Sequence, residues 1–307
     1  MDTILVNPAG TGGQGLISFV GAGPGAADLL TLRGASRLGA ADIVVWASSL
    51  VPADLLDHAQ PGATIHDSAG MTLEDVLAVY EDHPGAAIVR LHSGDPSLYG
   101  AIQEQIDWCH DHDRPFEIVP GVSSLSAAAA AVGRELTIPT VSQSVVVTRL
   151  ANRTSASMPA AESVAAYAAT GCSLAVFLSA ARPHALAAAL LAPGSRYTAE
   201  TPAAVVVRAS WSDEVVVRTT VGHLAADLEA TGATTTVLVL VGPFLEGAAP
   251  RSHLYSPTFA HSFRKRSAPG TTAGRPAAGK AARRRGATRT RRDLATPGES
   301  DLPTLPG

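Results

Sequence analysis

Cysteine, lysine and long apolar runs are scarce in this sequence of 307 residues. The two cysteines, Cys109 and Cys172, lie far apart without a CxxC spacing, which excludes a disulfide framework and a cysteine-based zinc site. No run of eighteen or more apolar residues occurs, so no transmembrane helix is expected. Residues 1–15 lack the basic and apolar segments of a signal peptide. We therefore expect a cytoplasmic protein with a flexible leader over residues 1–15.

Charge is also sparse and unevenly distributed. Charged residues make up 16% of the chain, against 46% hydrophobic residues. From Arg251 onward there are 12 Lys and Arg and 3 Asp and Glu, a net charge of +9, which leaves −13 for residues 1–250. The tail, residues 247–307, has almost no apolar periodicity and is expected to be disordered. Its arginines could bind nucleic acid, but no aromatic residues are interleaved with the arginine cluster, which favours a solvated basic tail.

Strand-like and helix-like segments alternate through the first half of the chain. This alternation predicts an α/β fold, with a mostly parallel sheet in an N-terminal domain over residues 16–120. Later strands are closer together and partly hairpin-like, which predicts a mixed sheet in a C-terminal α/β domain over residues 121–246. Thr72 and Asp75 form the pattern of a capping box at a helix start. The expected strands are 16–20, 42–46, 86–91, 116–119, 145–147, 173–178, 203–209, 215–219 and 234–241, and the expected helices are 28–38, 72–80, 101–109 and 123–132.

A glycine-rich turn, Gly21-Ala22-Gly23-Pro24-Gly25, follows the first expected strand and precedes a helix. Such turns use glycine where the backbone approaches a ligand closely or takes a positive φ. Two features argue against a dinucleotide site. Pro24 has no N–H to offer a pyrophosphate, and Asp42 precedes the second strand instead of ending it. No Lys-Ser/Thr pair follows, which excludes a Walker A loop. Taken alone, this motif fits a tight loop without a ligand as well as it fits a ligand-binding turn.

Two further loops follow expected strands. Residues 90–100 contain Gly94-Asp95-Pro96, which places a carboxylate at the carboxyl end of a strand, where open α/β sheets bind ligands. An Asp-Pro turn in which Asp95 caps the next helix is the alternative interpretation. Residues 120–124 close the next strand, so we expect the three turns to meet at one edge of the sheet. The run 109–113 contains metal-ligand residue types, but its spacing divides them between helix faces, so no metal site is expected.

Together these motifs resemble the tetrapyrrole (class III) methyltransferase family. The first half carries the resemblance in GAGPG (21–25), RLHSGDPSLYG (90–100) and PGVSS (120–124). The second half is similar to the precorrin-4 C11-methyltransferases within that family, through GRELTIP (133–139), VSQS (141–144), VVTR (146–149) and RASWSDE (208–214). The similarity covers residues 16–245. The chain departs from this subgroup at Thr140, where an acid is expected, and at Ser212, where proline is expected.

The resemblance implies a two-domain tetrapyrrole methylase fold with S-adenosylmethionine in a cleft between the domains, a homodimer, and precorrin-4 as a polycarboxylate substrate in cobalamin biosynthesis. Asp95 and Tyr99 are candidates to position the substrate or move a proton, and no metal is implied. Guanidinium groups pair with carboxylates, so arginines are the candidate substrate contacts. The implied cofactor contacts are Pro24, Ser93, Gly94, Asp95, Leu98, Ser123, Ser124, Leu178, Ala209, Thr235 and Thr236, and the candidate substrate contacts are Arg90, Arg134, Arg149, Arg153 and Arg208.

Several alternatives stay open at this point. A sibling enzyme acting at another ring position, or on cobalt-precorrin-4 in the anaerobic route, has the same motifs. A regulatory module working through its basic tail, and a nicotinamide dehydrogenase, are alternatives of other classes; Pro24 and Asp42 argue against the latter. The negative charge of residues 1–250 repels an acidic ligand at long range, so local arginines or the tail have to compensate.

Overall fold

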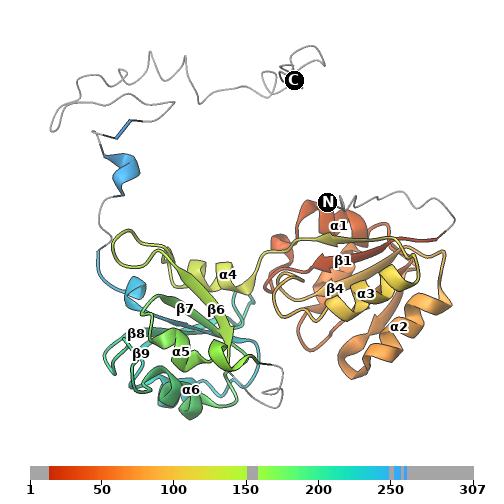
Figure 1. Ribbon diagram of the computed structural model, residues 1–307. Coiled ribbons are helices and arrows are strands. Elements are labelled where there is room, and N and C mark those ends of the chain that lie inside the picture. The colour runs from red at the N-terminus through yellow and green to blue at the C-terminus, as the bar shows by residue number, and fades with distance from the viewer. Residues whose placement is uncertain (1–13, 151–157, 249–251, 257–258, 261–307) are drawn as a thin grey trace, which may run out of the picture. The chain divides into compact units, whose positions relative to one another are not determined.

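The computed structural model describes residues 14–150, 158–248, 252–256 and 259–260. The chain divides into two units, residues 1–248 and 249–307. The first unit contains both sheets (Figure 1). In the second unit, the described residues include one short 3-10 turn, η7 (His253–Tyr255). Arg153 and most of the basic tail lie outside the described residues. Within the described part, no helix is long and apolar enough to cross a membrane.

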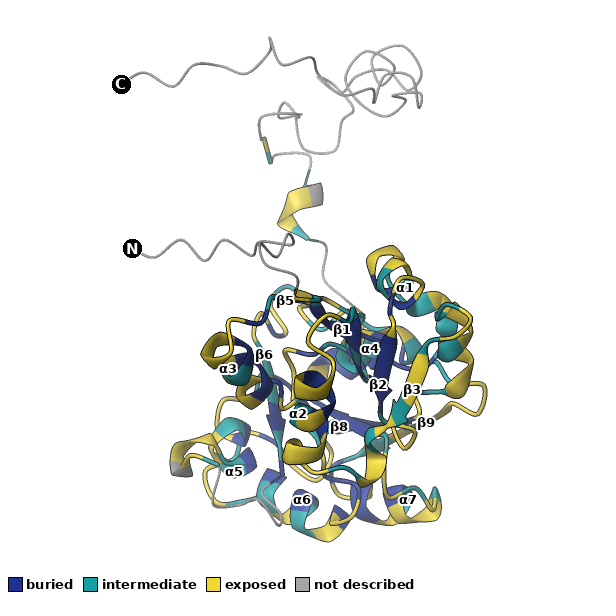
Figure 2. Ribbon diagram, turned by 90° about the vertical axis from the view of Figure 1, so that its right-hand side faces the viewer, coloured by how far each residue is buried: buried dark blue, intermediate teal, exposed yellow. Residues whose placement is uncertain are grey.

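The first sheet is entirely parallel, with strand order β3-β2-β4-β1-β5. Its strands are β1 (Ile17–Gly21), β2 (Ile43–Trp46), β3 (Thr64–Asp67), β4 (Ile88–His92) and β5 (Phe116–Val119). Parallel strands that are covered on both faces are buried along their length, as β1 and β2 are at every position. Edge strand β3 is largely exposed, and Figure 2 shows this contrast. The predicted α/β class is confirmed.

Helices cover both faces of this sheet. The helices are α1 (Leu32–Leu38), α2 (Leu73–Asp82) and α3 (Gln103–Asp111), with 3-10 turns η1 (Ala27–Leu29), η2 (Ala53–His58) and η3 (Ser68–Gly70). One core cluster contains Phe19 and Tyr80, and the cluster on the opposite face contains Val20 and Leu55. The predicted capping box is confirmed: Thr72 Oγ1 accepts from the Asp75 amide at 3.3 Å, while the Asp75 carboxylate accepts from the Thr72 amide at 2.8 Å.

The second sheet is mixed, with strand order β6-β7-β10-β8-β9. Its strands are β6 (Val145–Arg149), β7 (Ser173–Phe177), β8 (Pro202–Val207), β9 (Val215–Thr220) and β10 (Val237–Val241). Only the β6–β7 pair is parallel among the described pairings of this sheet. Central strand β10, sequence VLVLV, is buried at every position, because both of its faces are covered. The predicted mixed sheet is confirmed.

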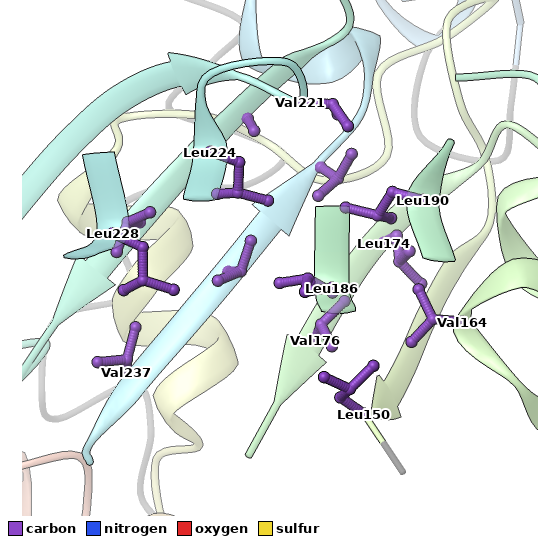
Figure 3. Close-up of a cluster of buried hydrophobic side chains, with 14 of the residues drawn as sticks. Leu150, Val164, Leu174, Val176, Leu186, Leu190, Val221, Leu224, Leu228 and Val237 are labelled. Atoms are coloured by element: carbon purple, nitrogen blue, oxygen red, sulfur yellow. The ribbon is translucent and has the colours of Figure 1, made fainter. Parts of the chain in front are cut away.

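Among the residues that the structure describes, the α-helices that pack on the second sheet are α4 (Ser124–Ala131), α5 (Val164–Ala168), α6 (Pro183–Leu190) and α7 (Leu224–Ala230). On one face, Leu186 and Leu190 of α6, Leu224 and Leu228 of α7 and Val176 of β7 belong to one buried cluster (Figure 3). Helix α4 contributes to the cluster on the opposite face, together with the 3-10 turn η6 (Pro243–Leu245). The change from the first sheet to the second therefore occurs between β5 and α4.

The topology brings the ends of several strands together at one edge of each sheet. Strand β1 lies between β4 and β5, so the loops after these three parallel strands leave the same edge of the first sheet. In the second sheet, β7 runs parallel to β6 and antiparallel to β10, so the ends of β6 and β7 lie beside the start of β10. The end of β8 lies at the same edge, because β8 is also antiparallel to β10.

Candidate functional site

The three turns after β1, β4 and β5 meet, as the sequence predicts. The amide of Ala22 donates to the carbonyl of His92 at 2.7 Å. Gly23 and Gly94 form an isolated antiparallel bridge, in which Gly94 N donates to Gly23 O at 2.7 Å and Gly23 N donates to Gly94 O at 3.2 Å. Main-chain hydrogen bonds thus hold the first two turns together.

Glycine is required here for two separate reasons. Gly23 and Gly94 have φ values of +81° and +66°, a region that residues with a Cβ rarely adopt. Gly21 and Gly121 are required by close approach instead. A Cβ on Gly121 would lie 2.1 Å from the carbonyl oxygen of Gly94, and a Cβ on Gly21 would lie 2.5 Å from the Cα of Gly121. The third turn therefore packs directly against the first two.

Asp95 joins the second turn to the third. Its Oδ2 accepts from the Gly121 amide at 2.9 Å, and its Oδ1 accepts from the amide of Ser97 at 2.9 Å and from the Ser97 hydroxyl. Burial opposes ionisation, but these hydrogen bonds outweigh it and hold the pKa of Asp95 below its usual range. The turn matches the alternative Asp-Pro interpretation, except that α3 begins only at Gln103, so Asp95 does not cap it. A stable carboxylate of this kind suits loop bracing better than proton transfer.

A cavity of about 460 Å³ opens at these turns and at the facing edge of the second sheet. All eleven residues expected to contact the cofactor line this cavity, as do Tyr99 and Arg149. The lining also includes residues that the sequence did not suggest: Leu50, Leu150, Phe177, Ser179, Ala180, Ala181, Val206, Thr234, Val237 and Leu238.

The cavity wall is mainly apolar, with polar groups at a few positions. Large apolar side chains reach into solvent at Leu98, Tyr99 and Leu178, the last with 62% of its surface exposed. Within the lining, Arg149 is the cation and Asp95 is the anion. Apolar walls with a few placed polar groups are typical of small-molecule sites. With a single cationic side chain in its lining, this cavity does not resemble a polyphosphate site.

Unusual backbone conformations gather at this cavity. Tyr99, Leu178 and Thr236 all line it and have φ values of +58°, +51° and +55°. Arg208 and Ser210, on either side of the lining residue Ala209, have φ values of +49° and +69°. Left-handed conformations of non-glycine residues carry a conformational cost and concentrate at functional sites. Their position here supports a ligand-binding role for the cavity.

The RASWSDE segment contacts the glycine-rich turn from the second sheet. The indole N–H of Trp211 donates to the carbonyl of Pro24 at 2.9 Å, and the amide of Ala26 donates to Ser210 Oγ at 3.0 Å. A Cβ on Gly25 would lie 2.1 Å from Cδ1 of Trp211, so the indole packs directly on the glycine. The segment that marks the subgroup in the sequence is thus the one that joins the two sides of the cavity.

Comparison with known proteins gives the family. The sequence model of the tetrapyrrole (corrin/porphyrin) methylases matches residues 16–225. The chain belongs to this family. A precorrin-4 C(11)-methyltransferase of Sinorhizobium sp is 44% identical to this methylase over 253 residues, which cover 81% of the chain and 98% of the relative.

Two solved structures resemble this tetrapyrrole methylase. A cobalt precorrin-4 methyltransferase from cobalamin biosynthesis matches with a TM-score of 0.72 and 39% identity, covering 76% of this chain and 96% of the other. The uroporphyrin-III C-methyltransferase of Thermus thermophilus, in complex with S-adenosylhomocysteine, matches with a TM-score of 0.62 and 27% identity, covering 75% and 99%. The predicted two-domain tetrapyrrole methylase fold is confirmed.

Two of the candidate substrate arginines of the methylase have structural partners and do not line the cavity. The guanidinium group of Arg90 donates to Ser68 Oγ at 2.9 Å and to Val45 O at 3.3 Å. That of Arg134 donates to three carbonyls of the 244–247 turn, including Phe244 O at 2.6 Å. These partners hold both guanidinium groups away from the cavity, which the sequence pattern could not reveal.

The other candidate arginines differ in their placement. Arg149, at the end of β6, lines the cavity. Arg208 pairs with Asp213 and lies 5.1 Å from the centre of the Trp211 ring, outside the lining. Arg153 lies outside the described residues. Arg149 is therefore the candidate that the structure brings to the cavity.

Tyr99 lies at the cavity mouth with 45% of its surface exposed, and its ring centre is 5.2 Å from that of Phe177. Burial raises the pKa of its phenol, which is therefore a neutral hydrogen-bond donor at physiological pH.

Within the described residues, no group of three or more His, Cys, Asp or Glu side chains could hold a metal ion.

Proposed function

We propose that this methylase transfers a methyl group from S-adenosylmethionine to C11 of precorrin-4, in the construction of the corrin ring of cobalamin. The observation that carries the proposal is the cavity where the three glycine-rich turns face the edge of the second sheet. The names of the relatives support the reaction and its ring position. The complex of the Thermus thermophilus relative with S-adenosylhomocysteine supports the choice of cofactor.

The residues of the cavity fit this cofactor. S-adenosylmethionine has no phosphate, so the lack of an N–H at Pro24 and the single cation of the lining are compatible with it. Hydroxyl and main-chain groups at Ser123, Ser124, Thr235 and Thr236 are available to the polar edges of a nucleoside, and Leu98 and Leu178 offer apolar surface to its rings. When bound, the cofactor supplies an activated methyl group.

The protein's own contribution is orientation and exclusion of water. The apolar wall limits access of water to the transfer site, and the braced turns fix the position of the cofactor relative to the substrate. Arg149 is the residue we assign to a substrate carboxylate, and the neutral phenol of Tyr99 is placed to donate a hydrogen bond at the cavity mouth. We assign the ionised Asp95 to loop positioning and not to proton transfer.

Calorimetry with S-adenosylhomocysteine tests the cofactor assignment. We expect the wild-type chain to bind it, and Asp95→Ala to bind at least tenfold more weakly, because loss of a charge-assisted hydrogen bond costs about 1.5–3 kcal/mol. The control is Asp107→Ala, which removes an exposed, hydrogen-bonded carboxylate of α3 outside the cavity lining. Absence of binding by the folded wild-type chain would refute the proposal.

Mass spectrometry of the methylated product tests the substrate. The two candidates are precorrin-4 and cobalt-precorrin-4, because relatives with either name match the chain. Transfer to C11 of either ring supports the proposal and decides between an aerobic and an anaerobic route. Methylation of an earlier intermediate, with neither of these rings accepted, would instead establish a sibling enzyme that acts at another position.

We further propose a cytoplasmic homodimer with a solvated basic tail that takes no part in catalysis. Light scattering of the purified chain measures the oligomeric state, and a monomer would overturn that part. Removal of residues 251–307 should leave cofactor affinity and methyl transfer unchanged. Loss of activity in a folded, cofactor-binding truncation would instead assign a working role to the tail.

A further inference from the structure

One buried hydroxyl of the cavity has no hydrogen-bond partner. Ser179 follows β7 and lines the cavity, with 1% of its surface exposed. Its Oγ exposes less than 1 Å² and has no partner. Burying a polar atom without a partner is unfavourable. Ser179 Oγ is one of five such side-chain atoms in the described part of the chain, and it is the one that lines the cavity.

The other buried serines of the described chain are all paired. Ser18 Oγ donates to Glu117 Oε1 at 2.8 Å. Ser142 Oγ donates to Ser144 O at 3.1 Å and accepts from the Ser173 amide at 2.9 Å. Ser173 Oγ donates to Leu136 O at 2.6 Å. The fold thus pairs its buried hydroxyls, and the exception, Ser179, is the one that lines the cavity.

The surroundings of Ser179 point to a ligand group and not to another part of the protein. Its neighbours along the chain, Leu178, Ala180 and Ala181, also line the cavity and carry no polar side-chain atoms. The backbone at Leu178 has a φ of +51°, so a left-handed residue precedes the serine. A serine side chain has one heavy-atom torsion, so a single rotation re-aims its hydroxyl along this wall.

We propose that the Ser179 hydroxyl hydrogen-bonds the nucleoside part of the bound cofactor; this inference rests on the proposed function. A side chain with 1% exposure contacts only a ligand that enters the cavity itself. At about 460 Å³, the cavity accommodates a nucleoside but not a tetrapyrrole macrocycle with its carboxylate arms. Adenine and ribose edges carry donors and acceptors, and a hydroxyl serves either.

The test is Ser179→Ala, with calorimetry against S-adenosylhomocysteine and against methylthioadenosine, which has the nucleoside but no amino acid arm. We expect both affinities to fall by the same factor, roughly three- to tenfold, the loss of one net hydrogen bond. The urea midpoint of the free protein should stay unchanged or rise, because the variant removes an unpaired buried hydroxyl.

Ser173→Ala is the matched control, since it replaces another buried serine, at the start of β7, that does not line the cavity. Its hydroxyl is paired in the free protein, so it should lower the urea midpoint and leave both affinities unchanged. Unchanged affinities in Ser179→Ala overturn the inference while leaving the proposed function intact. A loss with S-adenosylhomocysteine alone overturns the nucleoside assignment in favour of the amino acid arm. If the wild-type chain binds neither compound, the inference fails together with the proposed function.

Discussion

Replacing Gly121 with alanine tests whether close packing of the turns builds the cavity. A Cβ at this position would lie 2.1 Å from the carbonyl oxygen of Gly94, whereas ordinary contacts begin at about 3.4 Å. Gly121 and Gly94 both lie in turns that main-chain hydrogen bonds hold in place. The two turns must therefore move apart by more than 1 Å, the difference between the two distances. That movement weakens the hydrogen bond from the Gly121 amide to Asp95.

We expect a loss on the order of 3 kcal/mol in the free energy of unfolding, since overpacking costs about 1–3 kcal/mol and a hydrogen bond to a charged group about 1.5–3 kcal/mol, and the two overlap. Displacement of Ser123 and Ser124 should also weaken S-adenosylhomocysteine binding more than tenfold. Urea denaturation and calorimetry measure these effects. The control is Gly70→Ala, where nothing lies within 4 Å of the added Cβ and a change within about 1 kcal/mol is expected. Equal stability and affinity in Gly121→Ala and Gly70→Ala would refute the packing argument.

Three further substitutions test single interactions. Trp211→Phe removes the indole donor to Pro24 O while keeping an aromatic ring, and should lower cofactor affinity in calorimetry by roughly three- to tenfold; an unchanged value would show that the contact does not position the turn. His92→Phe should abolish an acid sensitivity, because burial, with a smaller effect of Arg90, lowers the pKa of His92 to about 3. The free energy of unfolding of the wild type therefore falls as the pH drops below 6.5, by on the order of 2 kcal/mol at pH 5, and urea midpoints at pH 7 and pH 5 measure the difference. Glu117→Gln should lower the urea midpoint at pH 7, because burial opposes ionisation of Glu117 but hydrogen bonding to Arg37 and Ser18 outweighs it and lowers the pKa of this carboxyl. The stabilisation is lost as the pH falls below 4.5, the usual pKa of a glutamate, so the urea midpoints of variant and wild type should converge in acid.

The sequence predicts strands best where they are buried and apolar. Strand β5 occupies its expected range, 116–119, because Phe116 and the residues after it end at a Pro-Gly turn. Strand β3 was not expected, since Thr64–Asp67 is an exposed edge strand without an apolar run. The short helices α5, α6 and α7 were also missed. Their segments are rich in alanine, and their packing against the sheet, not a strong local period, stabilises them.

The candidate site also has features that the sequence predicts and features that it does not. The meeting of three turns follows from the parallel direction of β1, β4 and β5 and from the placement of glycine, and the sequence predicts both. The sequence does not predict the direction in which a long side chain points. Arg90 and Arg149 each lie on a strand in an apolar context, yet only Arg149 lines the cavity, because Arg90 finds acceptors within its own sheet. Ser179 gave no signal at all, since an unpaired hydroxyl is recognised only when every neighbouring atom is placed.

The bridge between Gly23 and Gly94 has an evolutionary consequence. Main-chain groups join the turns of this wall of the cavity, so replacements at Gly23, Gly94 or Gly121 alter it by preventing the turns from meeting. The opposite wall consists of side chains, including those of Arg149, Phe177 and Leu178, which replacements can reshape one at a time. Replacements on the opposite wall can therefore change which molecule the cavity accepts while the arrangement of the turns is retained.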